Sequence, residues 1–243
     1  MESLAGRAAA VTGGARRLGR ALALALARAG CNVVVHYNRS ADDAARTVRE
    51  IEAMGVGAHA LQADLAVAAA AAPLVDAAVA AFGRLDVLVN SASLFEHASV
   101  ADIDAAAWDH VQAVNLRAPF LLSRAAAPHL AATGGSIVNI ADLSALQPWP
   151  TYAHHAVSKA GLVHLTRVLA RALGPVVRVN AIAPGTVLPP DDYTGEDHAG
   201  GPDRRVLARA GSPADVEQAL LYLVGSPFVT GQVLVVDGGR TLL

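Results

Sequence analysis

The sequence predicts an α/β fold in which helices cover both faces of one parallel sheet. Short runs rich in valine and isoleucine alternate along the whole chain with longer alanine- and leucine-rich segments of helical period. The short runs lack the polar alternation of a half-exposed strand, as expected when both faces are covered. We therefore expect a doubly wound sheet of seven strands, at residues 7–12, 32–36, 58–62, 87–90, 137–140, 178–183 and 233–236.

The composition fits a single domain that acts on small molecules. A chain of 243 residues is long enough for one large core, so we take residues 1–243 as one domain. The net charge is −2 and the basic residues are dispersed, which argues against nucleic-acid or membrane partners. Cys31 is the one cysteine, and no apolar run is long enough to span a bilayer. We expect a cytoplasmic protein without a metal site.

The first strand runs directly into TGGARRLGR, residues 12–20, and then into a helical pattern. Glycines at this place allow a tight turn in which backbone N–H groups and the helix N-terminus approach a pyrophosphate. Arg17 stands where a middle glycine is usual. Its guanidinium could pair with a phosphate, reach a substrate or lie in solvent.

The second strand ends in HYNRS, residues 36–40, and no carboxylate follows it. Arg39 can bind a 2′-phosphate, with Ser40 and His36 as further donors, so the pattern favours NADPH over NADH. Arg39 could instead be an ordinary surface charge, and Ser40 could cap the next helix. After the third strand, Asp64 could accept a hydrogen bond from the adenine amine or cap a helix.

The later elements carry the remaining candidates. Asp142 follows the fifth strand, and YAHHAVSK, residues 152–159, begins a long helix on which Lys159 lies one turn after His155. His154, next to it, is expected to be exposed. Residues 186–208 are rich in proline, aspartate and glycine, which indicates a substrate lid or an ordinary surface loop.

Ordered motifs make the whole chain resemble a short-chain dehydrogenase/reductase, a Rossmann-type fold. They are TGGARRLG (12–19), DL (64–65), NSAS (90–93), VNL (114–116), SIVNIAD (136–142), SKAG (158–161), RVNAIAPG (178–185) and VTGQVLVVDGG (229–239). Within the family, the chain is most similar to the pteridine reductases. That similarity rests on the arginine turn, HYNRS, Ser93, Phe95, Asp142 and Tyr152.

The resemblance implies an NADPH-dependent oxidoreductase, a homotetramer, that reduces a dihydropterin-like substrate. The expected catalytic residues are Asp142, His155, Lys159 and Asn115, the last one holding a proton-relay water by bending its helix. The expected substrate-binding residues are Arg17, Ser93, Phe95, Asp142 and Tyr152. The expected cofactor-binding residues are Gly13, Arg16, Arg17, Leu18, Gly19, His36, Arg39, Ser40, Asp64, Leu65, Asn90, Ala92, Lys159, Pro184 and Gly185.

The chain departs from the family at the proton donor, because His155 stands where the family has a tyrosine. Histidine exchanges protons readily at physiological pH, but the Lys159 cation is expected to keep the ring neutral, and imidazole is shorter than phenol. Asp142 could hold a proton if an apolar pocket raised its pKa, whereas Lys159 favours its ionised form. Tyr152 is a less favoured substitute donor. Two alternatives stay open: a weak or inactive NADPH-binding homologue, and a ketoreductase for acyl or sugar substrates.

Overall fold

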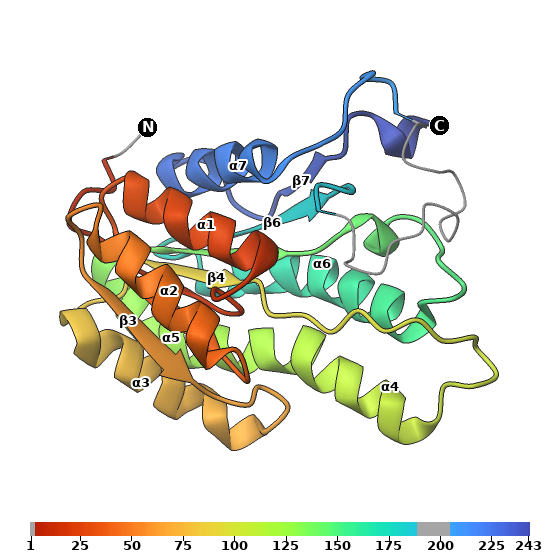
Figure 1. Ribbon diagram of the computed structural model, residues 1–243, viewed down its shortest axis with the longest axis horizontal. Coiled ribbons are helices and arrows are strands. Elements are labelled where there is room, and N and C mark those ends of the chain that lie inside the picture. The colour runs from red at the N-terminus through yellow and green to blue at the C-terminus, as the bar shows by residue number, and fades with distance from the viewer. Residues whose placement is uncertain (1–2, 189–204) are drawn as a thin grey trace.

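Seven parallel strands form one sheet in the order β3-β2-β1-β4-β5-β6-β7 (Figure 1). The computed structural model describes residues 3–188 and 205–243. The strands are β1 (Ala8–Val11), β2 (Asn32–Tyr37), β3 (Ala58–Gln62), β4 (Val87–Asn90), β5 (Ser136–Ile140), β6 (Arg178–Pro184) and β7 (Val233–Val236). All seven predicted strands are confirmed, with bounds that differ by one residue at most.

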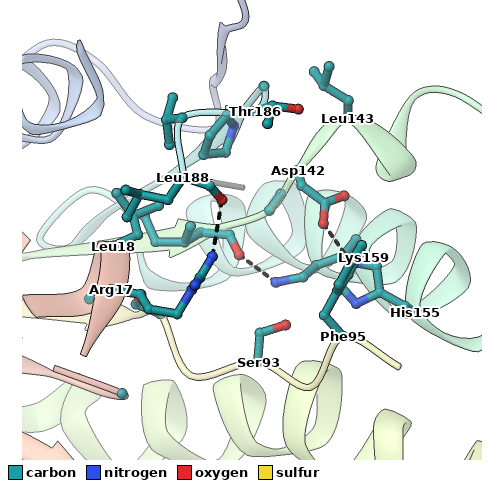
Figure 2. A pocket seen from close by; sticks show the side chains of 18 of the residues that line it. Arg17, Leu18, Ser93, Phe95, Asp142, Leu143, His155, Lys159, Thr186 and Leu188 are labelled. Carbon is teal, nitrogen blue, oxygen red and sulfur yellow. Dashed lines mark hydrogen bonds and ion pairs between the residues drawn. The ribbon is translucent and has the colours of Figure 1, made fainter. Parts of the chain in front are cut away.

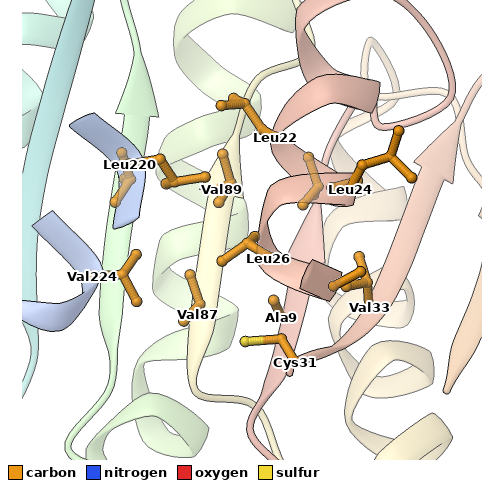
Figure 3. Close-up of a cluster of buried hydrophobic side chains, with 14 of the residues drawn as sticks. Ala9, Leu22, Leu24, Leu26, Cys31, Val33, Val87, Val89, Leu220 and Val224 are labelled. Carbon is orange, nitrogen blue, oxygen red and sulfur yellow. The ribbon is translucent and has the colours of Figure 1, made fainter. Parts of the chain in front are cut away.

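Helices cover both faces of this sheet, as the unbroken apolar strands predicted. The helices are α1 (Arg17–Arg28), α2 (Ala41–Glu52), α3 (Ala71–Phe82), α4 (Ala105–Gln112), α5 (Ala118–Thr133), α6 (Ala153–Leu173) and α7 (Pro213–Gly225). One core packs α1, α2 and α7 on one face, and Figure 3 shows Leu22, Leu26, Leu220 and Val224 gathered around Val87 and Val89. The other core packs α3, α5 and α6 on the opposite face.

The strand order places a ligand crevice at the centre of the sheet. The chain moves outward from β1 to β3, then returns to the middle and moves the other way from β4 to β7. The connections that leave β1 and β4 therefore diverge, and a crevice opens at this switch point beyond the carboxyl ends of the strands. The motifs that follow β1, β4, β5 and β6 all meet at this edge.

One helical turn between α4 and α5 is widened. Residues Ala113–Arg117 form a π-helical segment that joins the two helices, and Asn115 lies at its centre, fully buried. Such widened turns are rare and occur often at functional sites, because they redirect a side chain from the helix surface. The widened turn at Asn115 lies where the helix was expected to bend.

Two expectations concern segments of the surface. None of the helices within residues 3–188 and 205–243 is long and apolar enough to cross a membrane. The predicted lid at 186–208 lies mostly outside the described residues, of which it includes only 186–188 and 205–208.

Candidate active site

A cavity of about 600 Å³ opens beyond the carboxyl ends of β1, β4, β5 and β6. Figure 2 shows Asp142, His155, Lys159 and Phe95 gathered on one side of it and Arg17 opposite. The cavity is lined by Gly13, Arg16, Arg17, Leu18, Gly19, Ser91, Ala92, Ser93, Phe95, Ile140, Ala141, Asp142, Leu143, Trp149, His155, Lys159, Pro184, Gly185, Thr186, Val187, Leu188 and Arg240. Thirteen of the predicted site residues are thus brought together, from Gly13 to Gly185.

The glycine turn after β1 fits a pyrophosphate. A Cβ on Gly19 would lie 2.1 Å from the carbonyl oxygen of Gly13, so only glycine allows the turn to close this tightly. The turn leads into α1, whose N-cap residue, Arg16, makes no side-chain capping bond. The first N–H groups of α1 thus keep their capacity to donate to a phosphate. These backbone features fit the phosphates of a dinucleotide.

Arg17 extends from this turn towards the segment after β6. Its φ of 49° is the only left-handed backbone conformation of a non-glycine residue within 3–188 and 205–243. One guanidinium nitrogen, Nη2, donates to the carbonyl oxygen of Leu188 at 3.1 Å. Arg17 is exposed, and it lines the cavity between the glycine turn and the segment after β6.

The end of β2 differs from the expectation at His36. The ring is buried, Nδ1 accepts from the Gly13 N–H at 3.1 Å, and Nε2 donates to the Ala63 carbonyl at 3.1 Å. Because the chain itself uses both ring nitrogens, His36 offers no donor to a phosphate and instead holds the glycine turn to the sheet. Arg39 is exposed, and Ser40 is the N-cap of α2 without a side-chain capping bond.

The other predicted cofactor residues lie around the cavity rather than in its wall. Asp64 accepts from the N–H of Ala66 at 2.9 Å within a turn, and it does not cap a helix, because the next helical turn has Val67 as its N-cap. Leu65 belongs to the core. Asn90 is buried, with Nδ2 donating to Asn139 at 2.8 Å, and its Oδ1 has no partner within residues 3–188 and 205–243. Asn90 therefore helps to hold the ends of β4 and β5 together.

His155 and Asp142 form a hydrogen-bonded pair in the wall of the cavity. Nδ1 of His155 lies 2.8 Å from the carbonyl oxygen of Leu94, which can only accept, so Nδ1 carries a proton. Nε2 lies 2.5 Å from Oδ2 of Asp142. A carboxylate and an unprotonated ring nitrogen would repel each other at this distance, so the pair must hold one further proton between them.

The two members of the pair differ in exposure. The side chain of Asp142 is 22% exposed, whereas that of His155 is 2% exposed. Oδ1 of Asp142 accepts from both the backbone N–H and the hydroxyl of Ser144, at 2.9 and 2.5 Å. Asp142 is thus the member of the pair that a ligand can touch, and Ser144 fixes its orientation.

Charges decide the protonation of Asp142. Burial works to raise the pKa of its carboxyl, but the hydrogen bond and charge of His155 act against burial. Lys159 and Ser144 add to that effect, and the pKa falls below its usual value. The ionised form of the Asp142 carboxyl is therefore favoured. Of the two outcomes left open by the sequence, the field of the neighbouring cations prevails over desolvation.

Lys159 is almost fully buried beneath the pair. Burial lowers its pKa, and the Asp142 carboxylate opposes that shift. Nζ donates to the carbonyl oxygen of Ile140 at 2.8 Å and lines the cavity. An ammonium at this place can donate to the ribose of a bound dinucleotide and stabilise negative charge that develops on a substrate.

Asn115 positions the imidazole through the backbone of Leu94. Its Oδ1 accepts from the Leu94 N–H at 2.8 Å, and its Nδ2 donates to the Leu94 carbonyl at 3.0 Å. The same Nδ2 donates to the hydroxyl of Ser158 at 3.1 Å. Asn115 does not line the cavity, so it acts by holding the carbonyl that in turn orients His155.

Aromatic rings form the wall beside the pair. Phe95 stacks on Tyr152 with ring centroids 4.3 Å apart, and it meets the His155 ring edge-on at 4.8 Å. Tyr152 is buried behind Phe95 and does not line the cavity, contrary to its expected substrate contact. His154 is also buried, although exposure was expected, because its side of α6 lies against α4.

Sequence reasoning did not name several residues of the cavity wall as site residues, although two of them directly follow recognised motifs. Trp149, Thr186 and Arg240 all line the cavity. The signal for Arg240 was present in the sequence, because it directly follows the Asp237–Gly238–Gly239 turn after the last strand. Trp149 and Thr186 lie in loops after β5 and β6, whose paths no periodicity predicts.

Known proteins match this chain over nearly its whole length. A family model described as enoyl-(acyl carrier protein) reductase matches residues 13–241. The chain is 36% identical to 3beta-hydroxysteroid dehydrogenase 1 of Eggerthella lenta, over 99% of this chain and 96% of that one. It is 34% identical to the 3-oxoacyl-(acyl-carrier-protein) reductase FabG of Staphylococcus aureus, over 96% and 97%.

A solved structure shows the same architecture with a nucleotide bound. The chain superposes with a TM-score of 0.92 on a short chain dehydrogenase from Burkholderia cenocepacia in complex with NADP. The two sequences are 38% identical, and the match covers 99% of this chain and 100% of that one.

Proposed function

The chain belongs to the short-chain dehydrogenase/reductase family, and from this premise we propose that it is an NADPH-dependent reductase of a small-molecule carbonyl. One observation carries the proposal: the His155–Asp142 pair, which holds a proton in the wall of the cavity above Lys159. We propose that this pair replaces the tyrosine that family members use. The enzyme would then be active, and the histidine would be part of an adapted site.

The cofactor proposal rests on the residues after β1 and β2. The glycine turn and the open N-terminus of α1 fit the pyrophosphate, and Arg17 lies beside them. The exposed guanidinium of Arg39 would take the 2′-phosphate that distinguishes NADPH. Lys159 would donate to the nicotinamide ribose. The bound cofactor supplies a hydride from its reduced nicotinamide.

The chain's own residues supply the proton. As the hydride adds to the carbonyl carbon, the electron pair of the C=O bond moves to oxygen, and that oxygen needs one proton. The side chain of Asp142 is the more exposed member of the pair, and Nε2 of His155 lies 2.5 Å behind its carboxyl. We propose that the proton passes from Nε2 through the Asp142 carboxyl to the substrate oxygen, leaving neutral imidazole and an ionised carboxylate.

A dihydropterin is the second candidate substrate, and the exposed face of Phe95 favours it. Phe95 is 39% exposed and lies beside Asp142 and Ser93 in the cavity wall, where a planar ring could stack on it. The ketoreductase hypothesis instead rests on the similarity to a 3-oxoacyl reductase and a hydroxysteroid dehydrogenase. Both candidates need the same hydride and the same proton.

The test is NADPH oxidation by the purified protein, followed by the absorbance of the reduced nicotinamide. We expect turnover of simple ketones or aldehydes above a cofactor-only blank, and a fall of about 100-fold or more in kcat for His155→Gln, which keeps a donor but cannot transfer a proton. Dihydropterins in the same assay decide between the two substrates. An increase for His155→Tyr would favour the alternative that the chain is a cofactor-binding homologue with a decayed site.

We also propose a homotetramer in the cytoplasm. Apolar side chains are exposed on α5 and α6, at Phe120 and Val168, and near the C-terminus at Phe228, Leu242 and Leu243. Exposed apolar groups of this kind are typical of subunit contacts. Light scattering coupled to size-exclusion chromatography tests the assembly, and a monomer at micromolar concentration would contradict it.

A further inference from the structure

We propose that Arg240, together with Thr186, binds an anionic group of the substrate, so that the enzyme prefers carbonyl compounds that carry a carboxylate or a phosphate. The inference rests on the proposed reductase function and adds a substrate class to it. Its basis is a guanidinium that lines the cavity and is bonded to a hydroxyl, with no acidic partner among residues 3–188 and 205–243.

The turn that carries Arg240 is tightly held. After β7, Asp237 accepts from the N–H groups of Gly239 and Thr241 and from the Thr241 hydroxyl, each at 2.8 Å. Gly238 and Gly239 have φ angles of 67° and 82°, which permit the sharp reversal. These bonds fix the backbone on both sides of Arg240. A side chain placed by such a turn is suited to a specific contact, because little backbone freedom is lost when a ligand binds.

The guanidinium has a polar partner but no counter-ion. Nη1 donates to Oγ1 of Thr186 at 3.0 Å, and Arg240 is half-buried. No carboxylate within residues 3–188 and 205–243 lies within ion-pair distance of it. Asp142, the one carboxylate in the cavity wall, is bonded to His155 and Ser144. A half-buried cation without a counter-ion favours an anionic ligand.

The strand order places Thr186, the partner of Arg240, beside the strand that carries Asp142. Thr186 follows β6 by two residues, just as Asp142 follows the neighbouring β5 and Gly13 follows β1. Adjacent strands lie about 4.8 Å apart, so β5 is one spacing from β6, whereas β1 is three spacings, about 14 Å, away. By this spacing, the backbone of Thr186 is closer to that of Asp142 than to that of Gly13.

Matched aldehydes test the preference. The probes are 4-formylbenzoate, its neutral methyl ester and 4-formylphenyl phosphate, which present the same reducible carbonyl with different groups across a benzene ring. We expect wild type to favour an anionic probe over the ester by about 10- to 100-fold in kcat/KM, the range of one charge-assisted hydrogen bond. The larger of the two anionic preferences identifies carboxylate or phosphate as the ligand.

Substitution of the arginine should remove that preference. In Arg240→Ala, the kcat/KM for the anionic probes is expected to fall to the value for the ester. The kcat/KM for the ester and the Kd for NADPH should stay unchanged. Arg205→Ala is the matched control, because it removes an equal charge that lines a neighbouring cavity but not this one. The proposal is overturned if Arg240→Ala keeps the anionic preference, or if it weakens NADPH binding instead.

A binding measurement separates this proposal from the reductase assignment. If wild type turns over none of the aldehydes, calorimetry on the complex with NADP⁺ compares 4-hydroxymethylbenzoate with its methyl ester. Tighter binding of the carboxylate that is lost in Arg240→Ala supports the anion site without any catalysis. Equal binding of the two compounds overturns it.

Discussion

Two regions at the carboxyl edge of the sheet hold their polar groups in different ways. Beyond β5, Asp142 and His155 are bonded to each other, and Ser144, Asn115 and the backbone of Leu94 fix them further. Beyond β2, Arg39 is exposed to solvent. The first region is already organised for one chemical step, whereas the second must be ordered by its ligand. Substitutions in the first should therefore change kcat, and those in the second should change cofactor affinity.

The largest effect is expected at the proton-holding pair. Asp142→Asn replaces the carboxyl with an amide that cannot carry the proton onward, so kcat should fall by about 10²- to 10⁴-fold. Stopped-flow absorbance of the nicotinamide measures it, with NADPH fluorescence titration as the control for binding. Because the two side chains act as a unit, the double variant with His155→Gln should lose no more than either single one. Additive losses would show that the residues act separately.

The second effect concerns Arg39, in the region beyond β2. Arg39→Ala should weaken NADPH binding by about 10- to 100-fold and leave NADH binding nearly unchanged, because only NADPH carries the 2′-phosphate. Fluorescence titration with both nucleotides gives the ratio directly. Arg49→Ala, at the far end of α2, removes the same charge and is the control. A preference for NADH in the unaltered protein would contradict the assignment before any variant is made.

The difference between these two regions also explains which features the sequence could predict. Apolar runs predicted every strand, because covered strands need apolar side chains on both faces. Motif spacing predicted that Asp142, His155 and Lys159 meet, since Asp142 follows a strand and the other two share a helix. The roles of single polar atoms were beyond that reasoning. His36 was expected at a phosphate but is bonded at both nitrogens, and the direct contact of His155 with Asp142 depends on atomic reach.

The third effect, smaller than the first two, concerns the orientation of Asp142. Ser144→Ala removes the hydroxyl bond to Oδ1 and leaves the backbone bond in place, so kcat should fall by about 3- to 10-fold, the effect of one hydrogen bond. KM should remain the same. Ser144→Thr, which keeps the hydroxyl, should restore most of the rate. A loss of similar size in both variants would indicate that the side chain matters for packing alone.

The smallest effect is on the pH dependence of stability. The cationic surroundings of Asp142 hold the pKa of its carboxyl in the folded protein below the unfolded value of 3.8. A lowered pKa contributes stability that is fully present above the unfolded pKa and is lost as the pH falls through the folded one. When the pH is lowered below about 4, the Tm of wild type should therefore fall more than the Tm of Asp142→Asn. The shift should be a few degrees at most in a domain of this size, and calorimetric scans of both proteins measure it. Parallel curves would mean that the carboxyl is equally acidic in the folded and unfolded chain, and the lowered pKa assigned to Asp142 would then be wrong.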